Sequence, residues 1–167
     1  MIVYLVGITG AGKSTFGKKF AQVLEYDFVD LDIYIEKKAG KTIAQIFDLQ
    51  GEIGFRQLEK EALHEVSKLE NTLVATGGGT PCFFDNMEFM NETGHTVFLN
   101  IHPEIVAERL AKSNNTHRPM LAGKSKDEIL QFVRQKLDER IDFYEQATME
   151  VLDDNLVDFR MLKSMIF

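Results

Sequence analysis

The chain has 167 residues, of which 44% are hydrophobic, so it is long enough to form one compact domain with its own core. It carries 19 Lys and Arg residues against 26 Asp and Glu residues, and the resulting formal charge of -7 disfavours nucleic acid as a partner. One cysteine, Cys82, excludes an internal disulfide, and the short apolar start fits neither a signal peptide nor a membrane span. We therefore expect a cytoplasmic, single-domain protein over residues 1–167, with no membrane partner.

Five short β-rich runs alternate with amphipathic stretches along the chain. The runs are Ile2–Val6, Phe28–Leu31, Thr72–Ala75, His95–Leu99 and Met149–Leu152. Between them, apolar residues recur at helical spacing, and the longest such stretch covers about 126–144. Because apolar strands that alternate with helices form parallel sheets covered on both faces, we expect an α/β fold with three α/β/α layers and a five-stranded parallel sheet.

Residues 7–14 read G-I-T-G-A-G-K-S and match the phosphate-binding pattern G-x-x-x-x-G-K-S, directly after the first expected strand. Glycines let backbone N–H groups surround phosphate oxygens, and the following helix N-terminus adds a favourable potential. We expect this P-loop to bind the ATP phosphates through Gly10, Ala11, Gly12, Lys13, Ser14 and Thr15. Lys13 is predicted to reach the β- and γ-phosphates, and the Ser14 hydroxyl to be a ligand of Mg²⁺.

Two aspartates, Asp30 and Asp32, follow the second expected strand. Ligands of open α/β sheets bind beyond the carboxyl ends of the strands, and residues two apart lie on the same side of an extended chain. One aspartate is therefore predicted to hold Mg²⁺ through water, which we assign to Asp30, and the other to hold a substrate hydroxyl. The alternative for either residue is an N-cap that opens a helix at Ile33.

Three consecutive glycines, Gly77, Gly78 and Gly79, follow the third expected strand. Such a run weakens a regular element unless a ligand or another backbone must approach closely, and a flexible turn is the alternative. Arg56 lies early in one expected helix and Arg140 near the end of another. Taken alone, each arginine is expected to be a solvated charge paired with a nearby glutamate, such as Glu52, Glu59 or Glu139.

In their order along the chain, these pieces resemble the shikimate kinases over nearly the whole length. The matching segments are 7–14, 28–32, 51–56, 77–79, 118–121 and Arg140 followed by Tyr144. The resemblance implies a P-loop fold similar to that of nucleoside monophosphate kinases. It also implies transfer of the γ-phosphate of MgATP to the 3-hydroxyl of shikimate, within aromatic amino-acid biosynthesis.

The resemblance further implies which residues hold the substrate. They are Asp32, Arg56, Gly77, Gly78, Gly79 and Arg140. The two arginines would grip the carboxylate, and Asp32 would hold and activate the hydroxyls. By the same resemblance, helices at about 33–62 bind the substrate, and a lid at about 113–125 closes over ATP with Arg118 at the transferring phosphate.

The chain departs from the family after the last strand, where many members carry an arginine against the adenine. Here residues 153–157 read D-D-N-L-V. We therefore expect the adenine to be bound by Arg109 or by backbone contacts near Asn155. The four histidines and one cysteine are scattered and indicate no metal site of their own.

Two other functions remain open from the sequence. One is a kinase of the same architecture that acts on gluconate or a nucleoside monophosphate. The other is a nucleotide-dependent switch, although the chain lacks an N-K-x-D guanine signature. We expect a monomer, because a single-domain kinase must open and close around its substrates.

Overall fold

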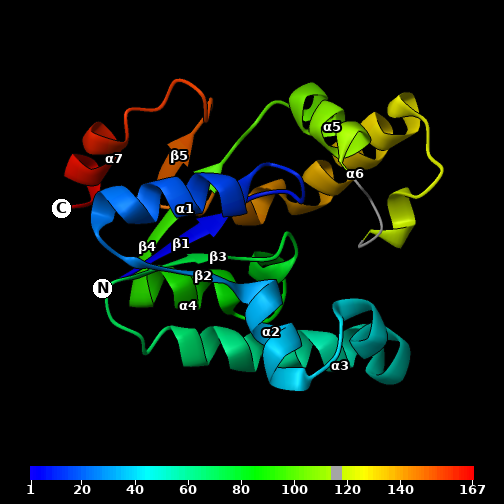
Figure 1. The fold of residues 1–167 in the computed structure, drawn as a ribbon, viewed down its shortest axis with the longest axis horizontal. Helices are drawn as coiled ribbons and strands as arrows, with labels where there is room; N and C mark the ends of the chain where they lie inside the picture. The colour runs from blue at the N-terminus through cyan, green and yellow to red at the C-terminus, as the bar shows by residue number, and fades with distance from the viewer. Residues whose placement is uncertain (114–117) are drawn as a thin grey trace.

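The computed structural model describes residues 1–113 and 118–167, and its centre is a parallel sheet of five strands (Figure 1). The strands are β1 (Ile2–Val6), β2 (Asp27–Asp30), β3 (Thr72–Ala75), β4 (Gly94–Leu99) and β5 (Met149–Val151). Their order across the sheet is β2-β3-β1-β4-β5, and every pair is parallel. The expected α/β fold with a five-stranded parallel sheet is confirmed.

Helices cover both faces of this sheet. The α-helices are α1 (Lys13–Leu24), α2 (Leu31–Ala39), α3 (Ile43–Val66), α4 (Asn86–Thr93), α5 (Pro103–Lys112), α6 (Lys126–Tyr144) and α7 (Phe159–Ile166). Figure 1 shows α1 and α7 on one side of the sheet and α3 and α4 on the other. Short 3-10 turns lie at η1 (Thr80–Cys82) and η3 (Pro119–Leu121).

The central strand β1 anchors the core because all five of its residues are buried. It pairs with β3 on one side and β4 on the other, so a polar side chain on either face would be removed from water. This burial explains the uninterrupted apolar run Ile2–Val6. The buried strand therefore fixes the position of its carboxyl end, and of the P-loop that follows it, in the middle of the sheet.

The boundary after β2 differs from the prediction, because Leu31 begins α2 instead of ending the strand. Asp30 is the N-cap of α2, and its Oδ1 accepts a hydrogen bond from the Ile33 N–H at 3.3 Å. Asp32 consequently lies in the first turn of the helix. The expectation that Asp30 and Asp32 share one side of an extended chain is wrong, since the chain turns between them. Three further strand boundaries move by one residue, at Asp27, Gly94 and Val151, and the remaining boundaries are as predicted.

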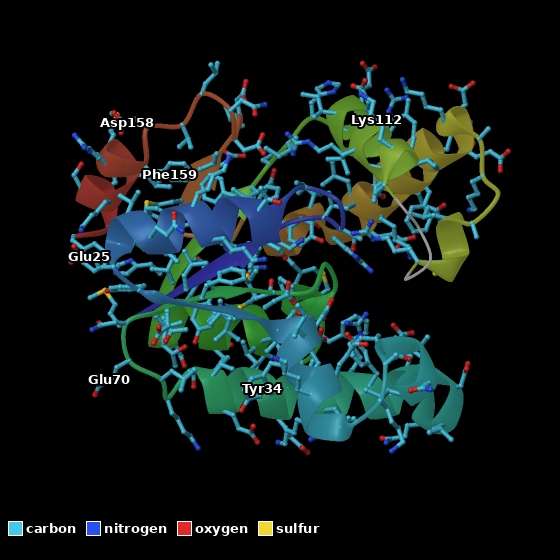
Figure 2. The ribbon with its side chains drawn as sticks, in the orientation of Figure 1. Glu25, Tyr34, Glu70, Lys112, Asp158 and Phe159 are labelled. Atoms are coloured by element: carbon cyan, nitrogen blue, oxygen red, sulfur yellow. The ribbon has the colours of Figure 1, made fainter. Side chains whose placement is uncertain are left out.

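Helix α3 begins with a capping box and contains a kink. Thr42 Oγ1 accepts from the Gln45 N–H, while the Gln45 side chain accepts from the Thr42 N–H. Gly51 has a φ of 69° inside the helix, a conformation that glycine adopts without the strain of a side chain. Tyr34, labelled in Figure 2, donates to Glu65 at 2.9 Å and joins α2 to α3.

Helix α7 returns to the sheet and packs its aromatic residue on α1. The Phe159 ring lies 5.0 Å from Phe16 and 5.7 Å from Phe20, and Figure 2 places Phe159 beside α1. Within residues 1–113 and 118–167, no helix is long and apolar enough to cross a membrane.

Replacing Phe159 by Ala should weaken the packing of α7 on α1. Because Phe159 is partly buried against two rings, we expect the change to lower the unfolding free energy by about 2 kcal/mol. Met161→Ala, at an exposed position of the same helix, is the control and should stay within about 0.5 kcal/mol of wild type. Urea unfolding measures both, and equal losses would contradict this packing role.

Candidate active site

The P-loop between β1 and α1 depends on glycines in the left-handed region. Gly10 has a φ of 88° and Gly12 a φ of 92°. A Cβ at Gly10 would also lie 2.7 Å from the Leu110 side chain of α5, so any side chain there would force Leu110 to move. These positions leave the backbone N–H groups at the start of α1 unobstructed, which is the requirement for binding phosphate.

Lys13, the first residue of α1, has a buried ammonium group. Its Nζ donates to the carbonyl oxygens of Gly7 at 2.6 Å and Ile8 at 3.0 Å. Burial lowers the pKa of Lys13 to about 8, and the negative charge of Asp32 opposes that shift. A nearby anion such as a nucleotide phosphate would favour the charged form further. The buried cation at the P-loop is thus suited to binding phosphate oxygens.

Ser14 and Asp30 are brought together from α1 and the end of β2. The Ser14 Oγ donates to Asp30 Oδ2 at 2.6 Å. Hydroxyl and carboxylate oxygens are the ligands that Mg²⁺ prefers, and Mg²⁺ usually takes its other ligands from phosphate and water. The two side chains therefore fit the predicted metal site, and Asp30 caps α2 with its second oxygen.

The glycine run after β3 is the point where three predicted substrate residues converge. A Cβ at Gly77 would lie 3.0 Å from Asp32 Oδ1, one at Gly78 3.1 Å from Arg140 Nη1, and one at Gly79 2.5 Å from Arg56 Nη2. Side chains from α2, α3 and α6 thus reach the same short segment. The close approach, and not a need for flexibility, explains the three glycines.

Arg56 is held rigidly and is 8% exposed. Its Nη1 donates to Glu59 at 2.8 Å, and its guanidinium lies 4.0 Å from the centre of the Phe83 ring. Within the described parts of the chain, the buried Nε has no hydrogen-bond partner. The expectation of a solvated arginine is therefore wrong for Arg56, because α3 directs it inward towards Gly79.

Glu59, which the sequence offered only as a surface partner of Arg56, is a buried residue of this site. It is 1% exposed, and its second oxygen accepts from the Thr80 hydroxyl at 2.8 Å. The pair Arg56 and Glu59 at i and i+3 on one helix was the available signal. That spacing is equally typical of surface pairs, so the sequence alone could not reveal its burial.

Asp32 lies among these charges with its carboxyl largely removed from water. Burial raises the pKa of Asp32 to about 6, and the negative charges of Glu59 and Asp30 add to the shift. Lys13 acts in the opposite direction but does not cancel it. A carboxyl with this pKa is ionised at neutral pH and can still accept a proton from a bound hydroxyl.

Arg109 joins the P-loop to the segment that follows β5. Its Nη1 donates to the Ala11 carbonyl oxygen at 3.0 Å and its Nη2 to Asp154 Oδ1 at 2.8 Å. Asp154 is 45 residues away in sequence, and nothing in its local pattern predicts the contact. Asn155 is exposed, and its backbone N–H donates to Asp153. The structure therefore places Asp154, and not Asn155, against Arg109 of α5.

Part of the predicted lid at about 113–125 is described. Arg118 donates to the Ser113 hydroxyl at 3.3 Å and precedes η3, and its positive charge contributes to the lowered pKa of Lys13. Residues 114–117 of the lid lie outside the described residues. Arg118 is thus within electrostatic reach of the P-loop lysine, as a residue at the transferring phosphate must be.

Comparison with known proteins gives a consistent result. A family model described as shikimate kinase matches residues 9–164. A shikimate kinase of Bacteroides thetaiotaomicron is 48% identical over 164 residues, which cover 98% of this chain and 93% of that protein.

Solved structures agree with this match. The crystal structure of shikimate kinase from Bacteroides thetaiotaomicron superposes with a TM-score of 0.89 at 48% identity, covering 99% of this chain and 94% of that one. Shikimate kinase from Acinetobacter baumannii in complex with shikimate gives a TM-score of 0.84 at 35% identity, covering 99% and 89%. From its sequence and its fold, the chain belongs to the shikimate kinase family of ATP-dependent kinases.

Proposed function

We propose that the chain transfers the γ-phosphate of MgATP to the 3-hydroxyl of shikimate, giving shikimate 3-phosphate and ADP. The observation that carries this proposal is the convergence of Asp32, Arg56 and Arg140 on Gly77–Gly79, beside the P-loop. Two guanidinium groups and one carboxylate match a small acid that also carries hydroxyls. A nucleobase acceptor would need a stacking platform and different hydrogen-bonding groups.

In this proposal the carboxylate of shikimate is bound by Arg56 and Arg140. Arg56 is fixed by Glu59 and by the Phe83 ring, so it loses little freedom on binding. Arg140 approaches Gly78 from α6. Planar guanidinium groups on two different elements would fix both the position and the orientation of a carboxylate.

Asp32 is the proposed group that orients the attacking hydroxyl and accepts its proton. Its pKa, raised to about 6 by burial and by Glu59, lies near the pH at which a general base works well. A Cβ on Gly77 would lie 3.0 Å from its Oδ1, so Asp32 lies at the acceptor side of the site. Phosphoryl transfer depends mainly on positioning and charge, and a single base suffices.

The phosphate side of the site consists of Lys13, Ser14, Asp30 and Arg118. Lys13 would neutralise the β- and γ-phosphate oxygens, and Arg118 would add positive charge as the phosphoryl group moves. Ser14 and Asp30 would hold Mg²⁺, which when bound neutralises phosphate charge. Closure of the lid at about 113–125 would exclude water as a competing acceptor.

We further propose that the protein is a cytoplasmic monomer whose partner is the small substrate alone. The formal charge of -7 and the single cysteine support this proposal. Light scattering of the purified chain tests the monomer, with and without ligands.

The function is tested by coupled ADP release with MgATP and separate acceptors: shikimate, gluconate, nucleoside monophosphates and water. We expect rapid turnover with shikimate alone. Turnover with a different acceptor would overturn the assigned substrate pocket. Tight ATP binding without turnover on any acceptor would favour a nucleotide-dependent switch.

Replacing Lys13 by Ala should remove a buried charge at the transferring phosphate. We expect kcat to fall by about 10²–10³-fold, as for the loss of one preorganised charged donor. Lys19→Ala, at an exposed position of the same helix, is the control and should keep wild-type turnover. Normal ADP release by Lys13→Ala would contradict its role.

Replacing Asp32 by Asn removes the proposed proton acceptor while preserving its shape. Loss of a general base lowers kcat by about 10²–10⁴-fold, and we expect a decrease in that range. Steady-state kinetics with saturating shikimate measures it. A variant that keeps kcat and loses shikimate affinity alone would show that Asp32 binds but does not activate.

The same variant tests the charge state of the site. The pKa of Asp32 in the folded state is about 6, above its ordinary value of 3.8, so protonation of Asp32 favours the folded state at low pH. This contribution to the unfolding free energy is lost as the pH rises through 6. Asp32→Asn removes this loss. Relative to wild type, it should be more stable at pH 8 than at pH 5 in urea unfolding. An equal difference at both pH values would count against the raised pKa.

Replacing Asp154 by Asn should weaken ATP binding without affecting shikimate binding. We expect the weakened hold on Arg109 to raise the KM for ATP about 5-fold, the equivalent of about 1 kcal/mol for a partly buried charged pair, while the KM for shikimate is unchanged. Asp153→Asn, the exposed neighbour, is the matched control. Equal KM values for ATP in both variants would refute a role for the Arg109 pair.

A further inference from the structure

Tyr144, the last residue of α6, is fully buried beside the acceptor side of the site. Its hydroxyl donates to the carbonyl oxygen of Gly78 at 2.5 Å. Its ring lies 5.2 Å from that of Phe98 on β4. The side chain therefore spans from the sheet to the glycine run, and its polar atom is the end that reaches the site.

The hydroxyl of Tyr144 also interacts with Arg140, one turn earlier on the same helix. Residues four apart lie on one helix face, and the positive charge of Arg140 acts on this hydroxyl, where it opposes the rise in the pKa of the phenol. Burial raises the pKa of the phenol well above its ordinary value, so it remains a neutral donor at any physiological pH. The hydroxyl thus donates to Gly78 and lies within electrostatic reach of Arg140.

Gly78 lies close to both the P-loop and Arg140. A Cβ on it would lie 2.6 Å from Thr9 Oγ1 of the P-loop and 3.1 Å from Arg140 Nη1. Its carbonyl oxygen is held by Tyr144. The position of Gly78 between the P-loop and Arg140 therefore depends on a bond that comes from the protein core.

We propose that Tyr144 is a positioning residue for shikimate, which it does not touch: its hydroxyl sets Arg140 and Gly78 in the arrangement that binds the carboxylate. This inference rests on the proposed function of the same site. A buried aromatic ring that serves packing alone would need no hydroxyl. Here the hydroxyl donates to Gly78, and Arg140 lies beside the same glycine, so the contact belongs to the acceptor side.

Tyr144→Phe tests this role because it keeps the ring and its packing on Phe98. The chain supplies a matched control in Tyr4, which is also fully buried and whose hydroxyl pairs with Thr93 Oγ1 at 2.9 Å, in a different part of the core. We expect Tyr144→Phe to raise the KM for shikimate about 5-fold, the usual effect of one lost hydrogen bond. The KM for ATP should stay within 2-fold of wild type in both variants.

Two results for the KM of shikimate would overturn the positioning role of Tyr144. An unchanged KM for shikimate in Tyr144→Phe, or an equal rise in Tyr4→Phe, would overturn the proposal, since a loss of general stability would affect both. Wild-type turnover with shikimate is measured first, so a failure of the proposed function is distinguished from a failure of this inference. If Tyr144→Phe folds poorly, shikimate binding by calorimetry at low temperature, compared with Tyr4→Phe, gives the same discrimination.

The route through Arg140 is tested by a double-mutant cycle. In an Arg140→Lys background, Tyr144→Phe should change the KM for shikimate by less than 2-fold, because the guanidinium that it positions is already absent. A full 5-fold effect in that background would overturn the assigned route.

Discussion

The buried ion pair between Arg56 and Glu59 is the interaction on which the acceptor side of the site depends. Both side chains are almost completely removed from water, and their 2.8 Å contact is supported by the Thr80 hydroxyl, which donates to Glu59. Removing one partner of such a pair leaves an uncompensated buried charge, which costs about 3–5 kcal/mol. The pair therefore holds α3 against η1 and the glycine run, and it sets the guanidinium where a substrate carboxylate can reach it.

Charge burial also links the two substrates. Burial lowers the pKa of Lys13 to about 8 and raises the pKa of Asp32 to about 6. The charged form of each group is therefore less stable here than it would be in water. In the proposed function, phosphate would compensate the charge of Lys13, while a substrate hydroxyl would donate to Asp32. A site that holds poorly solvated charges in fixed places is prepared for a reaction in which charge moves.

The sequence predicted the parallel sheet and the P-loop because both rest on local signals: apolar runs of strand length, and glycines at fixed spacing before Lys13. It misplaced the turn after β2, since Asp30 can end a strand or cap a helix and only the Ile33 contact decides between them. The burial of Arg56 and the partner of Arg109 could not be predicted at all. Both depend on residues brought together by the fold, such as Asp154, which is distant in sequence.

A crystal structure of the chain with MgADP and shikimate tests the central claim most directly. The account predicts the shikimate carboxylate between the guanidinium groups of Arg56 and Arg140, with the 3-hydroxyl within hydrogen-bond distance of Asp32 and Mg²⁺ near Ser14 and Asp30. Shikimate bound with its carboxylate away from both arginines, or with its 3-hydroxyl out of reach of Asp32, would contradict it.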